Sequence, residues 1–136
     1  LQGSLRYTQT NESERQDCQV LVLDTVGMLS RCYAYGSIAY VGGGMGTSGL
    51  HNILEPASEG IPIVIGKNYQ KFPEAKALIK LGGVISISAA GDCKKQLAEL
   101  IQNDALRTEK GKQNAGFVSQ NQGATEKTLS LLNQAL

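Results

Sequence analysis

The residues best suited to chemistry follow one glycine-rich loop. The loop reads GGGMGTSG from Gly42 to Gly49, and His51, Asn52 and Glu55 come shortly after it. Glycines let the backbone approach a ligand closely and direct its N–H groups at an anion. An Asn side chain can donate and accept hydrogen bonds, and one carboxylate can accept from two ribose hydroxyls. The combination predicts a pocket for a sugar nucleotide.

A dinucleotide-binding turn is the competing interpretation, because residues 44–49 also spell G-x-G-x-x-G. That turn should follow the first strand of its unit, with an acidic residue about 20 positions on, at the end of the next strand. Here the loop follows the second predicted strand, and the next strand ends Ile65-Gly66-Lys67-Asn68 without a carboxylate. The context therefore disfavours NAD.

Structural interpretations of the same residues stay open. A glycine-rich loop by itself is more often a tight turn, and a lone histidine at a helix start is more often a capping or packing residue. Glu55 could simply favour a helix N-terminus, which is worth about 0.3–1 kcal/mol.

The composition narrows the class of protein. A chain of 136 residues suits one domain, and 41% hydrophobic with 18% charged residues is ordinary for a soluble protein. A net charge of +1 gives no electrostatic case for nucleic acid. Cys18, Cys32 and Cys93 form no disulfide pattern, which favours a reducing cytosol. With one histidine and no D-x-D motif, we expect neither a metal nor another cofactor. No run is long enough to span a bilayer, and Leu1 suggests that this is a piece of a longer protein.

The pattern of apolar runs and turn residues predicts alternating strands and helices. We expect a polar surface loop at 9–17. A helix should follow, capped by Asp24 or Thr25 and ending at Gly36. Val26, Leu29 and Tyr33 should lie on one face of this helix. A helix capped by Asp92 should place Leu97, Leu100 and Ile101 inward. Strands are predicted at 19–23 (buried), 37–41, 60–66 and 83–87, and further helices at 52–59, 72–81, about 104–118 and 122–135. This order predicts an α/β fold, a Rossmann-like parallel sheet with flanking helices, whose ligand sits beyond the carboxyl ends of the strands.

Several motifs resemble those of one family. "DTVG" from Asp24, "YVGG" from Tyr40, "HNILEPA" from His51, "GIPI" from Gly60 and "NQGA" from Asn121 resemble D-T-M-G, F-V-G-G, H-N-P-L-E-P-A, G-x-P-V and N-Q-G-A. These belong to the carboxyl-terminal half of the transferases of 3-deoxy-D-manno-octulosonic acid (Kdo). Arg6-Tyr7 resembles the start of the same half, so the likeness covers almost the whole chain.

The resemblance implies a function. The family attaches Kdo to lipid A precursors and has the GT-B architecture, two Rossmann-like domains that face each other across a cleft. Residues 1–136 would be the carboxyl-terminal domain that binds the donor, CMP-Kdo, and the amino-terminal acceptor domain with the catalytic carboxylate would be absent. The chain would then be inactive alone and soluble, while the whole enzyme would work at the cytoplasmic face of the bacterial inner membrane. The donor-binding residues would be Arg6, Gly42, Gly43, Gly44, Ser48, His51, Asn52 and Glu55.

The chain departs from the family pattern at a few positions. Met28 replaces the usual acid after D-T-M-G, Leu50 replaces a glycine and Ile53 replaces a proline. A basic residue that often precedes the glycine pair before the histidine is missing, so phosphate contacts would come from hydroxyls and backbone N–H groups. We expect Gly43→Val to weaken CMP binding while the fold stays largely intact. The alternatives are another GT-B enzyme, such as a UDP-sugar transferase or epimerase, and a non-catalytic nucleotide-binding module.

Overall fold

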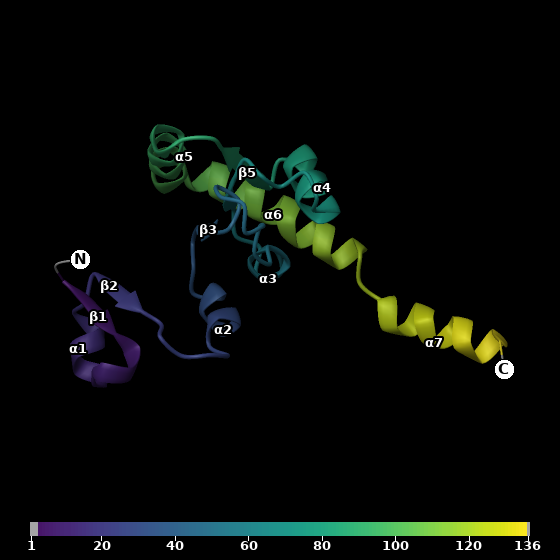
Figure 1. The fold of residues 1–136 in the computed structure, drawn as a ribbon, viewed down its shortest axis with the longest axis horizontal. Helices are drawn as coiled ribbons and strands as arrows, with labels where there is room; N and C mark the ends of the chain where they lie inside the picture. Colours follow the sequence, from purple (N-terminus) through teal and green to yellow (C-terminus); the bar gives the residue numbers. More distant parts are fainter. Residues whose placement is uncertain (1–2, 136) are drawn as a thin grey trace. The chain divides into compact units, whose positions relative to one another are not determined.

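A computed structural model describes residues 3–135 of the chain, so Leu1, where we expect a fragment boundary, lies outside the described residues. The chain divides into two compact units, residues 1–35 and residues 36–136 (Figure 1). Each unit has its own parallel sheet with helices around it, which confirms the predicted α/β class.

The first unit is built on two short parallel strands. Strand β1 (Ser4–Arg6) pairs with β2 (Val20–Val22), and Arg6 lies opposite Val22. A 3₁₀ turn (Tyr7–Gln9) and helix α1 (Glu12–Gln16) connect the strands, and helix α2 (Leu29–Tyr33) follows them. Because the strands are parallel, Arg6 and the residues after Val22 lie at the same edge of the sheet.

The predicted loop at 9–17 is wrong, because a capped helix occupies most of it. Asn11 accepts a hydrogen bond from the Glu14 N–H at 3.0 Å, and Glu14 accepts one from the Asn11 N–H at 2.9 Å. This reciprocal pair is a capping box, which supplies partners for backbone donors at the start of a helix. The N-x-x-E spacing carried this signal in the sequence.

Two further predictions for the first unit are wrong. The strand at β2 is present, but Val20, Leu21 and Val22 are exposed rather than buried, since a two-stranded sheet has little to cover it. Helix α2 has Met28 at its N-cap, without a side-chain hydrogen bond, so neither Asp24 nor Thr25 caps it, and Val26 lies outside it. Asp24 instead accepts from the N–H and the hydroxyl of Thr8, at 3.1 and 2.7 Å.

The second unit contains a three-stranded parallel sheet in the order β3-β4-β5. Its strands confirm three predicted strands, and Tyr40, Val64 and Ile85 pair across them in one row. The elements in chain order are β3 (Ala39–Val41), α3 (Leu54–Ser58), β4 (Ile63–Gly66), α4 (Pro73–Leu81), β5 (Val84–Ile87), α5 (Ala90–Gln102), α6 (Asp104–Gln120) and α7 (Ala124–Ala135).

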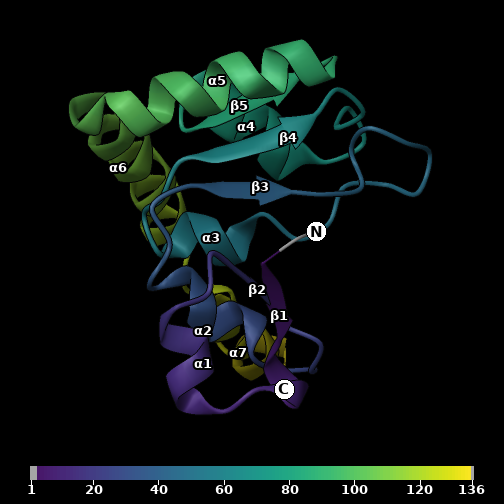
Figure 2. The ribbon, with the colours of Figure 1, turned by 90° about the vertical axis from the view of Figure 1, so that its left-hand side faces the viewer.

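Helix α5 packs along this sheet (Figure 2). Its buried Leu100 joins Val64 and Ile87 in a core cluster, and Cys93 and Leu97 pack against that cluster. Side chains alternate between the two faces of a strand, and the alternate set is buried as well: Ala39, Val41, Ile63, Ile65 and Val84. The sheet is therefore covered on both faces, as expected of a parallel sheet.

Helix α6 is attached to the amino-terminal ends of the strands by a buried asparagine. Asn114 is fully buried, and its Nδ2 donates to the Ile61 carbonyl at 2.7 Å and the Gly83 carbonyl at 3.0 Å. Gly83 leaves the space for this side chain, since a Cβ there would lie 1.9 Å from Asn114 Oδ1. One side chain thus pairs the carbonyls that lead into β4 and β5.

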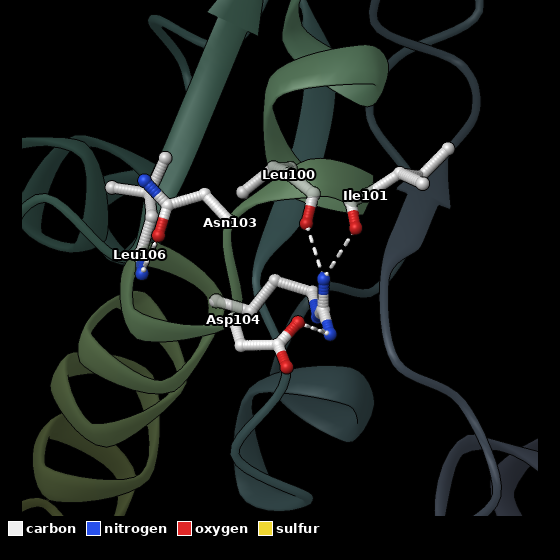
Figure 3. Close-up of polar contacts among 6 residues, drawn as sticks. Leu100, Ile101, Asn103, Asp104 and Leu106 are labelled. Carbon is white, nitrogen blue, oxygen red and sulfur yellow. Dashed lines mark hydrogen bonds and ion pairs between the residues drawn. The ribbon is translucent and has the colours of Figure 1, made fainter.

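Two details of α5 differ from prediction. The helix begins at Ala90, and Asp92 lies in its first turn, where it accepts from the N–H groups of Ser88 and Ala89, each at 3.1 Å. Ile101 is exposed rather than inward. At the other end of α5, the Arg107 guanidinium donates to the carbonyls of Leu100 (2.6 Å) and Ile101 (2.9 Å) and pairs with Asp104 (Figure 3).

Helix α7 has exposed side chains throughout residues 124–134, Leu129, Leu131 and Leu132 among them. Figure 1 shows it after a bend at 121–123 that follows α6. No helix within residues 3–135 is long and apolar enough to cross a membrane.

Candidate functional site

The glycine-rich loop starts at the carboxyl end of β3, the first strand of its own sheet. In the sequence, a dinucleotide turn is disfavoured partly because the loop follows the second predicted strand. That premise is wrong, because β3 is the first strand of its sheet in chain order. The other premise holds, since β4 ends at Gly66 and no acid follows it in Lys67-Asn68. The carboxyl ends of parallel strands are where ligands bind in such sheets.

Gly43 has a structural role in the loop. Its φ is +88°, and a Cβ at this position would lie 1.9 Å from the Gly49 carbonyl oxygen and 3.0 Å from His51 Cδ2. The His51 N–H also donates to the Gly42 carbonyl at 3.2 Å, which closes the loop. The expectation that Gly43→Val leaves the fold intact is wrong, because any side chain here must displace the Gly49 backbone.

Gly44 is buried against the end of the neighbouring strand. A Cβ at Gly44 would lie 3.0 Å from the Gly66 nitrogen, and a Cβ at Gly66 would lie 2.2 Å from the Gly44 carbonyl carbon. The two backbones are thus in direct contact. This contact fixes the loop relative to β4.

Asn68 holds the loop from the same side. Its backbone N–H donates to the Gly44 carbonyl at 2.8 Å, and its Nδ2 donates to the Gly46 carbonyl at 2.9 Å. A trans peptide places its C=O and the following N–H on opposite sides, and no described peptide is cis. The N–H groups of Met45 and Thr47 therefore point away from Asn68. Within residues 3–135 neither of these two N–H groups donates a hydrogen bond, so both lack an acceptor in the described chain.

Asn52 and Glu55 form a pair at the start of α3. Asn52 Nδ2 donates to Glu55 Oε1 at 2.9 Å, and Asn52 Oδ1 accepts from the Leu54 N–H at 3.0 Å. These bonds orient the Asn52 amide and leave Glu55 Oε2 able to accept from a ligand hydroxyl. His51 and Asn52 are exposed, and Glu55 is half-buried.

The predicted site residues divide between the two units. Gly42, Gly43, Gly44, Ser48, His51, Asn52 and Glu55 all lie within 14 consecutive residues of the second unit, at or after the end of β3. Arg6 lies in the first unit, with its guanidinium 3.9 Å from the Asp24 carboxylate. The Thr8 hydroxyl, followed by the Thr8 N–H, is the main cause that lowers the pKa of Asp24, and Arg6 contributes less. Asp24 therefore stays ionised beside Arg6.

Sequence reasoning missed Asn68 and Gly66. Gly66 is the last residue of β4, the neighbour of β3, and Asn68 comes shortly after it. The rule that ligand loops gather where parallel strands end would have indicated both residues. A search for an acid at the end of β4 does not detect the amide of Asn68.

The chain is 33% identical over 130 residues to the 3-deoxy-D-manno-octulosonic acid transferase of Haemophilus influenzae, which covers 93% of this chain and 30% of that protein. A solved structure, the C-terminal CMP-Kdo binding domain of WaaA from Acinetobacter baumannii, superposes with a TM-score of 0.72 and 26% identity. The chain is a relative of the Kdo transferases.

Further matches agree with this relationship. The Kdo transferase of Aquifex aeolicus is 32% identical over 93 residues, which is 68% of this chain and 26% of that protein. The chain thus spans about 30% or less of these two relatives. The Acinetobacter domain matches 87% of this chain and 61% of its own. No family model matches.

Proposed function

We propose that this chain is the donor-binding domain of a Kdo transferase, and that it binds CMP-Kdo. The observation that carries the proposal is the glycine loop with two free N–H groups, followed directly by the Asn52–Glu55 pair. One feature suits an anion and the other suits hydroxyls, which is what a nucleoside monophosphate presents. The names of the related transferases and of the matching domain support the same ligand.

The loop would bind the phosphate of the donor. The N–H groups of Met45 and Thr47 and the Ser48 hydroxyl would donate to its oxygens, with Gly42, Gly43 and Gly44 shaping the backbone. Arg6, in the first unit, stays a predicted donor-binding residue, since its guanidinium is largely exposed and its 3.9 Å pair with Asp24 leaves donors free. His51, next to Gly42 and Gly43, would help to position the phosphate.

The Asn52–Glu55 pair would bind the ribose. Glu55 Oε2 would accept from ribose hydroxyls, and the hydrogen bond from Asn52 keeps this carboxylate in place. Glu55 would thus act in binding rather than as the base of the reaction.

In the reaction, a hydroxyl of the acceptor would attack the anomeric carbon of Kdo, and CMP would leave. Negative charge grows on the departing phosphate, and donors that are already in place stabilise it with little rearrangement. The acceptor, a lipid A precursor, and the catalytic base would belong to an amino-terminal domain in a longer GT-B protein. That protein would work at the cytoplasmic face of the bacterial inner membrane.

Calorimetric titration of this chain with CMP, UMP and UDP tests the proposal. We expect CMP to bind most tightly and Glu55→Gln to weaken CMP binding. Glu59→Gln is the matched control, because Glu59 is the exposed residue at the end of the same helix. Stronger binding of UDP than of CMP would favour a UDP-sugar enzyme, and equal effects of both substitutions would remove Glu55 from the ribose site.

A further inference from the structure

The glycine loop borders a cavity that includes Thr47 and Ser48 of the proposed phosphate site, and whose other lining residues the proposed function leaves unassigned. The cavity has a volume of about 650 Å³ and lies between residues 46–49 and the segment after β4. Thr47 and Ser48 line one wall, and Asn68, Lys71 and Phe72 line the other. It is large enough to admit a monosaccharide, and it is open to solvent.

The two walls are joined by specific contacts. Asn68 Nδ2 donates to the Gly46 carbonyl at 2.9 Å. A Cβ on Gly49 would lie 3.7 Å from Phe72 Cζ, so the ring packs directly under the loop. The Phe72 N–H donates to the Tyr69 carbonyl at 2.9 Å, which closes the turn that carries Lys71. These contacts fix the two walls of the cavity relative to each other.

The lining carries one charge, and it is positive. Lys71 contributes an ammonium group, and no Asp or Glu is among the lining residues. Two ion pairs occur within residues 3–135, Arg6–Asp24 and Arg107–Asp104, so Lys71 has no acidic partner in that range. Hydroxyls and amides supply the remaining polar atoms, an arrangement that suits a sugar with one negative group.

We infer that this cavity binds the carboxylate-bearing sugar of the donor, with Lys71 as the partner of the carboxylate. The inference rests on the proposed function. The Met45 and Thr47 N–H groups point away from Asn68, and Asn68 lines this cavity, so these two phosphate donors do not point at the wall that carries Lys71. The sugar, an octulosonic acid, brings a second anion of its own. Lys71 would select a sugar acid over a neutral sugar on the same nucleotide.

The test compares two ligands on four proteins. Dissociation constants for CMP and for freshly prepared CMP-Kdo are measured on the chain and on Lys71→Met, Lys71→Arg and Lys67→Met. Lys67 is the matched control, an exposed lysine of the same segment that does not line the cavity.

We expect Lys71→Met to weaken CMP-Kdo binding about tenfold and to leave CMP binding unchanged. Lys71→Arg should keep most of the affinity because it keeps the charge, and Lys67→Met should change neither ligand. Added salt should weaken CMP-Kdo binding more in the unmodified chain than in Lys71→Met.

Three results would overturn the inference. Unchanged CMP-Kdo binding in Lys71→Met would remove Lys71 from the site, and equal weakening of both ligands would assign it to the phosphate. CMP-Kdo binding no tighter than CMP would mean that the cavity does not hold the sugar, while the proposed nucleotide site survives. If the unmodified chain binds neither ligand, the proposed function itself fails.

Discussion

Alanine substitutions at Gly43 and at Gly46 should differ strongly in their effect on the free energy of unfolding, although the two glycines lie three residues apart. Gly43 has φ +88°, which costs an L-residue about 1–2 kcal/mol. Its Cβ would also lie 1.9 Å from the Gly49 carbonyl oxygen, so the Gly49 backbone must move. Forced displacement in a packed region costs about 1–3 kcal/mol. We therefore expect Gly43→Ala to lower the free energy of unfolding by about 2–5 kcal/mol.

Gly46→Ala serves as the matched control. A Cβ at Gly46 meets nothing within 4 Å, and its φ is not positive. The substitution should change the free energy of unfolding by less than about 0.5 kcal/mol, or raise it slightly by restricting the unfolded chain.

Urea unfolding followed by circular dichroism measures both variants against the unmodified chain. The midpoint should fall clearly for Gly43→Ala and stay nearly constant for Gly46→Ala, with similar slopes. Equal stability of the two variants, or a larger loss at Gly46, would refute the packing of the loop against Gly49 described above. If Gly43→Ala is destabilised as expected, loss of binding in that variant would not be specific, and phosphate binding has to be tested at residues other than Gly43.

Four further substitutions test other parts of the molecule. In the full-length enzyme, Glu55→Gln should raise the KM for CMP-Kdo about tenfold with little change in kcat, since ribose contacts are similar in ground and transition states. A collapsed kcat with an unchanged KM would assign Glu55 to the chemistry. Asn114→Leu should destabilise the second unit by about 2–4 kcal/mol in urea because two buried carbonyls lose their donor, while exposed Lys112→Ala on the same helix should not. The pKa of Asp24 is lowered from its ordinary 3.8, so its contribution to stability is present above pH 3.8 and is lost as the pH falls below that value. The stability of Asp24→Asn should therefore depend less on pH in this acid range than that of the unmodified chain. Identical acid-unfolding profiles of the two proteins would contradict this prediction. Arg107→Met should shift the thermal midpoint down by removing donors from the end of α5, and an unchanged midpoint would mean that solvent replaces them fully.

The sequence predicted the second unit better than the first for a physical reason. Each strand of the β3-β4-β5 sheet is an apolar run between glycines or polar turns, and such runs identify themselves locally. Strand β1 has three residues and exists through its pairing with β2, some 16 positions away, so no local pattern predicted it. The start of α5 was missed because Asp92 reaches back to Ser88 and Ala89 rather than capping the helix itself.

The same distinction applies to the candidate site. The glycine loop and the Asn52–Glu55 pair are close in sequence, and their types and spacing predicted them. The contacts of Asn68 with Gly44 and Gly46 join segments more than 20 residues apart, and the cavity beside Lys71 lies between those segments. Hydrogen bonds of this kind depend on the order of the strands in the sheet, and no local sequence pattern specifies that order.

The contact between Gly44 and Gly66 limits how the protein can be engineered. A methyl group on Gly66 would lie 2.2 Å from the Gly44 backbone, so that position accepts no side chain without moving the loop, and Gly44 has little more room. Met45, Thr47 and Ser48, by contrast, carry exposed side chains on the same loop. A library intended to change donor selectivity should therefore vary residues 45, 47 and 48 together with 71, and keep both glycines constant.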